Sequence, residues 1–232
     1  MLILAIDTAL DACAAAVLDT ESSKVIAQES QAMKRGHAEA LMPLVARVMK
    51  QSGVGFAALD RIAATTGPGS FTGLRVGLSA ARGIALAANK PVVGITTLTA
   101  YAAPHLSEHG EHPIISAIDA RHDHVYLQVV SGRGESLLTP RVAPIAEALA
   151  ASRFGAPYLA GNAANLLAER WPDDASPPVK VDQQAAADII WVAWLAAAVD
   201  PAVATPRPFY LRAPDAKPPA DQLPRTAETQ AT

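Results

Sequence analysis

Apolar and polar positions in the first hundred residues follow the short periods of β-strands. Leu2 to Ile6, Ala12 to Leu18 and Lys24 to Ser30 are three short runs separated by polar turns, and they predict a meander of three strands. Asp60 to Thr66 and the segment from Pro91 to Ile95 predict two further strands. Helical patterns lie between these runs, which indicates an α/β fold.

Two of these helical patterns are long. From Gly36 to Gln51 the apolar residues follow the i, i+3, i+4, i+7 spacing of an amphipathic helix, at Leu41, Leu44, Val45 and Val48. Gly73 to Ala88 predicts a second helix rich in small residues, and a third helix is expected from about Thr97.

The strand pattern restarts near the middle of the chain. Ala117-Ile118-Asp119-Ala120 repeats Ala5-Ile6-Asp7-Thr8, and in both copies the aspartate ends an apolar strand that is followed by a turn and another strand. This repeat predicts a duplication, with two lobes whose strand-end aspartates face a shared cleft.

The second half predicts fewer elements than the first. Strands are expected to about Val130 and from Tyr158 to Ala160, with helices at Ala143 to Ala151, Ala163 to Arg170 and Ala185 to Val199. We therefore expect a complete first lobe over 1–104 and a reduced second lobe over 105–212. Residues 213–232 are rich in proline and predict a disordered tail.

Composition and charge narrow the class of protein. Half of the 232 residues are hydrophobic, the formal net charge is −3 and the pI is about 6.1. A chain that bound tRNA on its own would need clustered Lys and Arg, so any RNA contact is expected through a partner. The single cysteine, Cys13, lies in an alanine-rich strand and is expected to be buried and unreactive. No apolar run is long enough to span a bilayer, which predicts a cytoplasmic protein with no membrane contact.

A glycine-rich loop joins the fourth strand to the second helix. Gly67, Gly69 and Gly73 allow unusual backbone angles or close approach, and the loop ends at a helix whose first N–H groups lack helical acceptors, near Ser70. The loop could hold an anion, or it could be an ordinary strand-to-helix corner. It lacks the Lys-Ser/Thr of a P-loop and has one residue more than the dinucleotide fingerprint.

This loop, together with Ala5-Ile6-Asp7-Thr8 and Phe209-Tyr210-Leu211-Arg212, resembles the TsaB (YeaZ) family over residues 1–212. The resemblance implies a two-lobed fold like those of actin, sugar kinases and Hsp70 (ribonuclease H-like), with a reduced second lobe. It also implies a role in making N6-threonylcarbamoyladenosine next to the anticodon of tRNA. The expected role is that of a non-catalytic subunit that forms a heterodimer with the transferase TsaD, is joined by the ATPase TsaE, and meets tRNA only through the complex.

The two strand-end aspartates each have two interpretations. In active members of the superfamily the position of Asp7 faces Mg²⁺ and nucleotide phosphate, and Asp119 would have the same role in the second lobe. Both could instead be turn aspartates that hold their own backbone. The candidate nucleotide or phosphate contacts are Asp7, Gly67, Gly69, Ser70 and Asp119. The protein is expected to have no cofactor of its own, with ATP or ADP at the subunit junction of the complex.

Two histidine patterns bear on metal binding. The resemblance implies that TsaD holds a metal with two histidines four residues apart on its first helix, and this chain has His37 followed by Leu41 at that spacing. His37 is then expected to be an exposed residue near the helix start. His105, His109 and His112 form a second cluster, but Gly110 and Pro113 interrupt any helix there, so a linker is the favoured interpretation and no metal is expected.

The two long helices are predicted to carry the partner surface. Gly73, Gly77, Ala81 and Ala85 form a small-residue stripe that favours close packing against another helix, either a partner's or an element of the same chain. The apolar residues on the neighbouring faces are more than one face can bury, and Arg75 and Arg82 could reach acidic groups across an interface. The predicted interface consists of Leu41, Met42, Val45, Met49, Gly73, Leu74, Arg75, Gly77, Leu78, Ala81 and Arg82. The same face makes a homodimer of the isolated chain plausible.

An enzyme is the rival hypothesis. It would be a small kinase or ATPase that uses Asp7, Asp119 and the loop from Gly67 to Gly73, or a metallopeptidase of the same superfamily. A metallopeptidase would need a second metal-binding histidine where this chain has Leu41, which disfavours that activity. No catalytic residue is assigned.

Overall fold

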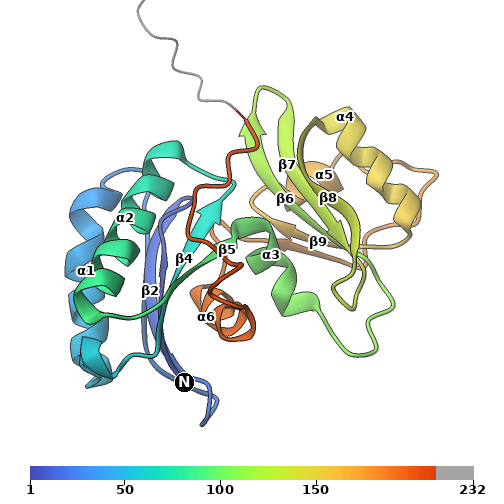
Figure 1. Cartoon of the computed structure of the whole chain (residues 1–232). Coiled ribbons are helices and arrows are strands. Elements are labelled where there is room, and N and C mark those ends of the chain that lie inside the picture. Colours follow the sequence, from blue (N-terminus) through green and yellow to red (C-terminus); the bar gives the residue numbers. More distant parts are fainter. Residues whose placement is uncertain (213–232) are drawn as a thin grey trace, which may run out of the picture.

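The computed structural model describes residues 1–212. The predicted tail over 213–232 lies outside the described residues. The chain forms two five-stranded sheets that face each other across a central layer of helices (Figure 1).

The first sheet contains the five strands predicted in the first half. Its order is β3-β2-β1-β4-β5, with β1, β2 and β3 antiparallel and with β4 and β5 parallel to β1. The bounds are Leu2–Asp7 for β1, Ala12–Asp19 for β2, Lys24–Ala32 for β3, Arg61–Gly67 for β4 and Val92–Thr96 for β5.

The second sheet repeats this topology. Its order is β10-β9-β6-β7-β8, again with an antiparallel meander and two parallel strands added beside the first strand of the meander. The bounds are Ile114–Arg121 for β6, His124–Val130 for β7, Ser136–Pro144 for β8, Tyr158–Gly161 for β9 and Lys180–Gln183 for β10. The duplication predicted from the repeated Ala-Ile-Asp sequence is therefore present in the fold. The apolar pattern of the sequence did not predict β8 or β10.

Helices cover the outer face of each sheet and fill the space between the sheets (Figure 1). The helices α1 and α2 pack on the first sheet, and the short α4 and α5 pack on the second, while α3 and α6 lie between the two sheets. The bounds are His37–Ser52 for α1, Phe71–Ala88 for α2, Thr97–Ala102 for α3, Ile145–Ala148 for α4, Ala164–Ala168 for α5 and Ile189–Ala198 for α6. Three 3₁₀ turns occupy Phe56–Ala58, Ala103–His105 and Leu149–Phe154.

The central core joins the two halves of the chain. Ile3 and Ala5 of β1 belong to the same buried cluster as Ile118 of β6, with Leu98 of α3 and Val192 of α6 between them. Because α3 contacts strands of both sheets, the two sheets share one apolar interior.

The last helix corrects the expected division of the chain. Although α6 lies within the range assigned to the second lobe, it packs against β1, β2, β4 and β5 of the first sheet. The inner face of that sheet is almost wholly apolar and needs a cover, and α6 is apolar around most of its circumference. The guanidinium of Arg61 at the start of β4 donates to the carbonyls of Ala196 and Val199, the latter at 2.8 Å, and so caps the C-terminal end of α6.

No helix within 1–212 combines the length and the apolar character that crossing a bilayer requires.

Candidate functional site

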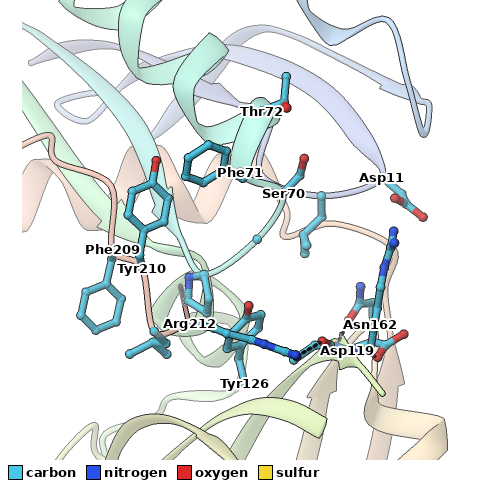
Figure 2. Close-up of a pocket in the computed structure, with 16 residues that line it drawn as sticks. Asp11, Ser70, Phe71, Thr72, Asp119, Tyr126, Asn162, Phe209, Tyr210 and Arg212 are labelled. Atoms are coloured by element: carbon cyan, nitrogen blue, oxygen red, sulfur yellow. Dashed lines mark hydrogen bonds between the residues drawn. The ribbon is translucent and has the colours of Figure 1, made fainter. Parts of the chain in front are cut away.

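A cavity of about 430 Å³ lies between the two lobes, at the ends of the central strands (Figure 2). The first lobe contributes the β1–β2 turn and the loop before α2, and the second lobe contributes the β6–β7 turn, Tyr126 and Asn162. A segment near residue 210 forms a further wall. The lining residues are Leu10, Asp11, Pro68, Gly69, Ser70, Phe71, Thr72, Asp119, Ala120, Arg121, Tyr126, Asn162, Phe209, Tyr210, Leu211 and Arg212.

The glycine-rich loop is packed against its own lobe. The hydroxyl of Ser70 accepts a hydrogen bond from the N–H of Gly73 at 3.2 Å and caps α2, and the Ser70 N–H donates to the carbonyl of Ala9 at 2.7 Å. A Cβ on Gly69 would lie 3.3 Å from that of Ala9 and closer still to the Ala9 carbonyl oxygen, and a Cβ on Gly73 would collide with the carbonyl oxygen of Thr8. These glycines therefore allow a strand-to-helix corner to pack on the β1–β2 turn.

Asp7 lies outside the cavity. Its side chain is fully buried, and one carboxylate oxygen accepts hydrogen bonds from the Thr65 hydroxyl at 2.5 Å and the Ala9 N–H at 2.9 Å. Burial raises the pKa of the Asp7 carboxyl, and the hydrogen bonds from Thr65 and Ala9 offset part of that rise. The expectation that Asp7 contacts a nucleotide is corrected, because the β1–β2 turn and β4 enclose this carboxylate. Gly67 is likewise buried and outside the lining.

Asp119, the counterpart of Asp7 in the repeat, is exposed and lines the cavity. Its backbone N–H donates to the side-chain oxygen of Asn162 at 2.8 Å, and its carboxylate accepts from the N–H of Arg121 at 2.7 Å. Arg121, His122 and Asp123 all have left-handed backbone angles, with φ of 61°, 51° and 55°. This costly conformation makes a tight turn that places Arg121 beside Asp119 at the cavity wall.

The segment from Ala204 to Arg212, called the strap below, forms one wall of the cavity with its last four residues. Phe71 and Tyr210 have ring centroids 5.0 Å apart, and the guanidinium carbon of Arg75 lies 3.8 Å from the centre of the Phe71 ring. Arg212 donates to the carbonyl of Ala120 at 3.2 Å, which is drawn as a dashed line in Figure 2. Arg121, Arg212, Asp11 and Asp119 all line one cavity, so the site could hold a small polar or charged molecule.

The predicted partner surface is mostly buried within the first lobe. Six apolar side chains of the predicted interface have exposed fractions of 5 % or less. They pack against the outer face of the first sheet or into the central core, and they are Leu41, Val45, Met49, Leu74, Leu78 and Ala81. Gly73 and Gly77 face Thr8, so the small-residue stripe packs on an element of the same chain. Met42, Arg75 and Arg82 are the predicted interface residues that remain exposed.

The histidines also differ from expectation in part. His37 is nearly buried, with an exposed fraction of 9 %, and its Nε2 lies 3.0 Å from the carbonyl oxygen of Leu10. His105 lies 3.1 Å from the carboxylate of Asp182 and stacks on Tyr158, which His112 contacts edge-on. Over 1–212, no three His, Cys, Asp or Glu side chains are grouped so that they could hold a metal ion.

Sequence reasoning missed part of the cavity wall. Tyr126 lies inside an ordinary alternating strand and gave no signal. The residues from Phe209 to Arg212 did give one, since they belong to the motifs that identify the family, but the motif alone does not show that they line a cavity.

Two sheets of the same topology, a shared interior and a cavity between the lobes define the class of two-lobed proteins to which sugar kinases belong. The ROK hexokinase of Thermus thermophilus shares this fold with a TM-score of 0.50 at 16 % identity, over 85 % of this chain and 99 % of the kinase. Residues 24–189 match the family model described as TsaD: tRNA N6-adenosine threonylcarbamoyltransferase. The chain belongs to the family that this model describes, and within it to the TsaB (YeaZ) branch.

Two relatives support the branch. The tRNA threonylcarbamoyladenosine biosynthesis protein TsaB of Haemophilus influenzae is 38 % identical over 128 residues, which are 55 % of this chain and 53 % of the relative. YeaZ from Pseudomonas aeruginosa superposes with a TM-score of 0.72 at 28 % identity, over 90 % of this chain and 99 % of that structure. The match thus spans about half the length of the curated TsaB relatives.

Proposed function

We propose that this chain is the partner subunit of a tRNA threonylcarbamoyltransferase and has no catalytic centre of its own. One observation carries the proposal: the chain belongs to the TsaB (YeaZ) branch, whose relatives are named as tRNA threonylcarbamoyladenosine biosynthesis proteins. The reaction in which it would take part forms N6-threonylcarbamoyladenosine in tRNA, with TsaD as the transferase.

Two positions on the first helix, α1, favour a non-catalytic role for this chain. Leu41 occupies the position at which a second metal-binding histidine would have to lie, and its side chain is 1 % exposed within the first lobe. The ring of His37 is held by the carbonyl of Leu10. The two positions therefore serve the packing of α1 on its sheet.

We place the pairing surface on the outer layer formed by α1 and α2, with fewer residues than the sequence pattern predicts. Leu86 is 84 % exposed and Met42 is 48 % exposed, and a Cβ on Gly83 would meet no atom within 4 Å. Small and apolar groups on the outside of two helices are suited to close packing against the helices of a structurally similar lobe. TsaD, the partner we propose, would offer such a lobe, since this chain matches the TsaD model over residues 24–189.

The test is to mix the purified chain with the TsaD of the same organism and to measure the mass of the mixture by light scattering. TsaE, ATP and the substrates are then added and tRNA modification is followed. We expect a one-to-one complex on which modification depends. Modification at full rate without this chain would contradict the proposal.

The surface is tested with Leu86→Glu and Met42→Glu, which introduce charge into the outer layer. We expect each to weaken pairing by at least tenfold without lowering the melting temperature. Val203→Glu is the matched control, because Val203 is 79 % exposed but lies outside α1 and α2. Light scattering of the isolated chain shows whether the same surface forms a homodimer, which Leu86→Glu should then abolish.

The cavity supports a second candidate, a nucleotide site. Asp119, Arg121 and Ser70 line a space of about 430 Å³ between the lobes, so ATP or ADP could bind there or at the subunit junction. Calorimetric titration of the isolated chain with ATP, repeated with Asp119→Asn, tests this. Saturable binding and ATP hydrolysis that both require Asp119 would favour the enzyme over the partner subunit.

A further inference from the structure

The strap is bound to the first lobe along most of its length. The Gly94 N–H of β5 donates to the carbonyl of Ala204 at 2.9 Å, and the Phe209 N–H donates to the carbonyl of Thr66 at 2.8 Å. Pro206 and Pro208 restrict the backbone between these two points, so little conformational entropy is lost when the strap docks.

Two glycines of the first sheet, Gly94 and Gly67, lie so close to the backbone of the strap that a side chain at either position would contact it. A Cβ on Gly94 would collide with the methyl group of Thr66. It would also lie 2.8 Å from the carbonyl oxygen of Thr205 and 3.1 Å from the Cα of Pro206. A Cβ on Gly67 would lie 2.8 Å from a methyl group of Leu74 and 3.2 Å from the carbonyl oxygen of Phe209. The edge of the first sheet is thus shaped to receive this segment.

Two arginines on α2 hold the strap from the side. Arg82 donates to the carbonyl of Pro206, and the Nε–H of Arg75 donates to the hydroxyl of Tyr210 at 3.4 Å. The ring of Phe71 at the start of α2 packs at a tilt of 32° against the ring of Tyr210. Arg75 and Arg82 are exposed on α2, so a molecule that binds the outer face of this helix would contact them directly.

The same segment ends on the second lobe. Arg212 binds the carbonyl of Ala120 in β6, next to the left-handed turn that carries Arg121 into the cavity wall. Phe209 to Arg212 also line the cavity, so the strap runs from α2 across the cavity to the β6–β7 turn (Figure 2).

We propose that the strap is a releasable link that transmits changes on the outer face of α2 to the cavity wall in the second lobe. When its contacts with Arg75 and Arg82 are lost, the wall formed by Phe209 to Arg212 loosens and the β6–β7 turn loses its tie to the first lobe. This inference concerns the chain alone and holds whichever partner binds α2.

The experiment is amide hydrogen exchange on the full chain, read at the strap and at the β6–β7 turn. Arg207 and Phe209 report on the strap, since their N–H groups are hydrogen-bonded and their proline neighbours give no signal. Asp119 and Arg121 report on the turn, since their N–H groups bind Asn162 and the Asp119 carboxylate.

Gly94→Ala should displace the strap, and the double variant Arg82→Ala/Tyr210→Ala should release it by removing side chains at the surface. We expect exchange at least tenfold faster at Phe209 and at least threefold faster at Asp119 and Arg121 in both variants. Gly83→Ala is the matched control and should exchange as the wild type does, because its Cβ meets open space.

Unchanged exchange at Phe209 in the double variant would overturn the strap as a releasable element. Fast exchange at Phe209 with unchanged exchange at Asp119 and Arg121 would overturn the link to the second lobe. Should Gly94→Ala accelerate exchange throughout the protein, the double variant decides the outcome, because Arg82 and Tyr210 are exposed.

Discussion

Asp7 and Asp119 end equivalent strands, but their carboxylates have different environments. Asp119 is exposed at the cavity, whereas Asp7 is buried and its second carboxylate oxygen has no hydrogen-bond partner within the described residues. The two copies of the repeat therefore share a backbone position without sharing a chemical role.

The buried carboxyl of Asp7 predicts a pH dependence of stability. Because burial raises its pKa above the ordinary value of 3.8, the folded state binds this proton more tightly than the unfolded chain does. The free energy of unfolding should then fall as pH rises from the ordinary carboxyl pKa through the raised pKa of the folded state. In Asp7→Asn this loss is absent, so the difference in unfolding free energy, variant minus wild type, should increase with pH across that window.

Urea unfolding at a series of pH values measures this difference. Asp11→Asn, which changes an exposed carboxylate in the same turn, is the matched control. Parallel pH profiles for Asp7→Asn and the wild type would show that Asp7 is not the source.

Gly77 and Gly83 on α2 should respond to alanine with opposite signs. A Cβ on Gly77 would collide with the hydroxyl of Thr8, and we expect Gly77→Ala to cost about 1–3 kcal/mol. A Cβ on Gly83 meets open space, so Gly83→Ala should stabilise by up to about 1 kcal/mol through helix propensity. Urea unfolding of both variants checks this, and equal effects would refute the close packing of α2 on the β1–β2 turn.

Cys13 should be unreactive in the folded protein. Its side chain is buried, and burial raises the pKa of the thiol to about 11, so little thiolate forms near neutral pH. We expect a disulfide reagent such as DTNB to react at least 100-fold faster after unfolding in urea. Comparable rates before and after unfolding would mean that β2 opens readily.

Among the elements, α6 depends on one side chain from a distant strand. Arg61→Met keeps the apolar stem but removes the hydrogen bonds to the carbonyls of Ala196 and Val199. We expect a loss of about 1.5–3 kcal/mol in the free energy of unfolding, the range for hydrogen bonds to a charged donor. Denaturant unfolding measures it, with Arg133→Met on an exposed turn as the control. A loss no larger than in the control would mean that α6 is held by packing alone.

Sequence patterns predicted the elements with strong periodicity and all five strands of the first sheet, but they missed β8 and β10, the two edge strands of the second sheet. The helices α1 and α2 begin and end within two residues of their predicted limits. In contrast, β8 contains Pro140 and Pro144, and most of β10 is exposed, so neither has the apolar alternation that identifies a strand. Their pairing comes from the neighbouring strand and not from their own composition.

The candidate site was predicted less well than the fold. Spacing along a helix shows which residues share a face, but it cannot show whether the chain's own sheet or a partner covers that face. For this reason Leu41, Val45 and Leu78 were assigned to an interface although they pack in the lobe itself. Asp119 and Ser70 line the cavity, because strand ends and helix starts meet there in this fold, and their contact with a nucleotide or phosphate stays a prediction.

At the scale of the whole molecule, the shared interior predicts a single unfolding transition. Ile118 and Ala160 of the second sheet belong to the same buried cluster as Ile3 and Val192, so neither lobe can unfold without exposing the other. Trp171 packs against the outer core of the second lobe, and Trp194 lies on α6. Variants that retain only one of these two tryptophans should show the same unfolding midpoint by fluorescence. Two midpoints separated by more than the experimental error would show that the lobes unfold independently.

The position of α6 also bears on how the chain folds during synthesis. The inner face of the first sheet is covered by residues 189–198, which leave the ribosome after the whole second sheet has been made. The first lobe therefore cannot finish its interior as an independent N-terminal unit, as successive domains usually do. Its apolar inner face stays open until the second sheet has been translated, and we expect chaperones that bind exposed hydrophobic strands to bind the nascent protein during that interval.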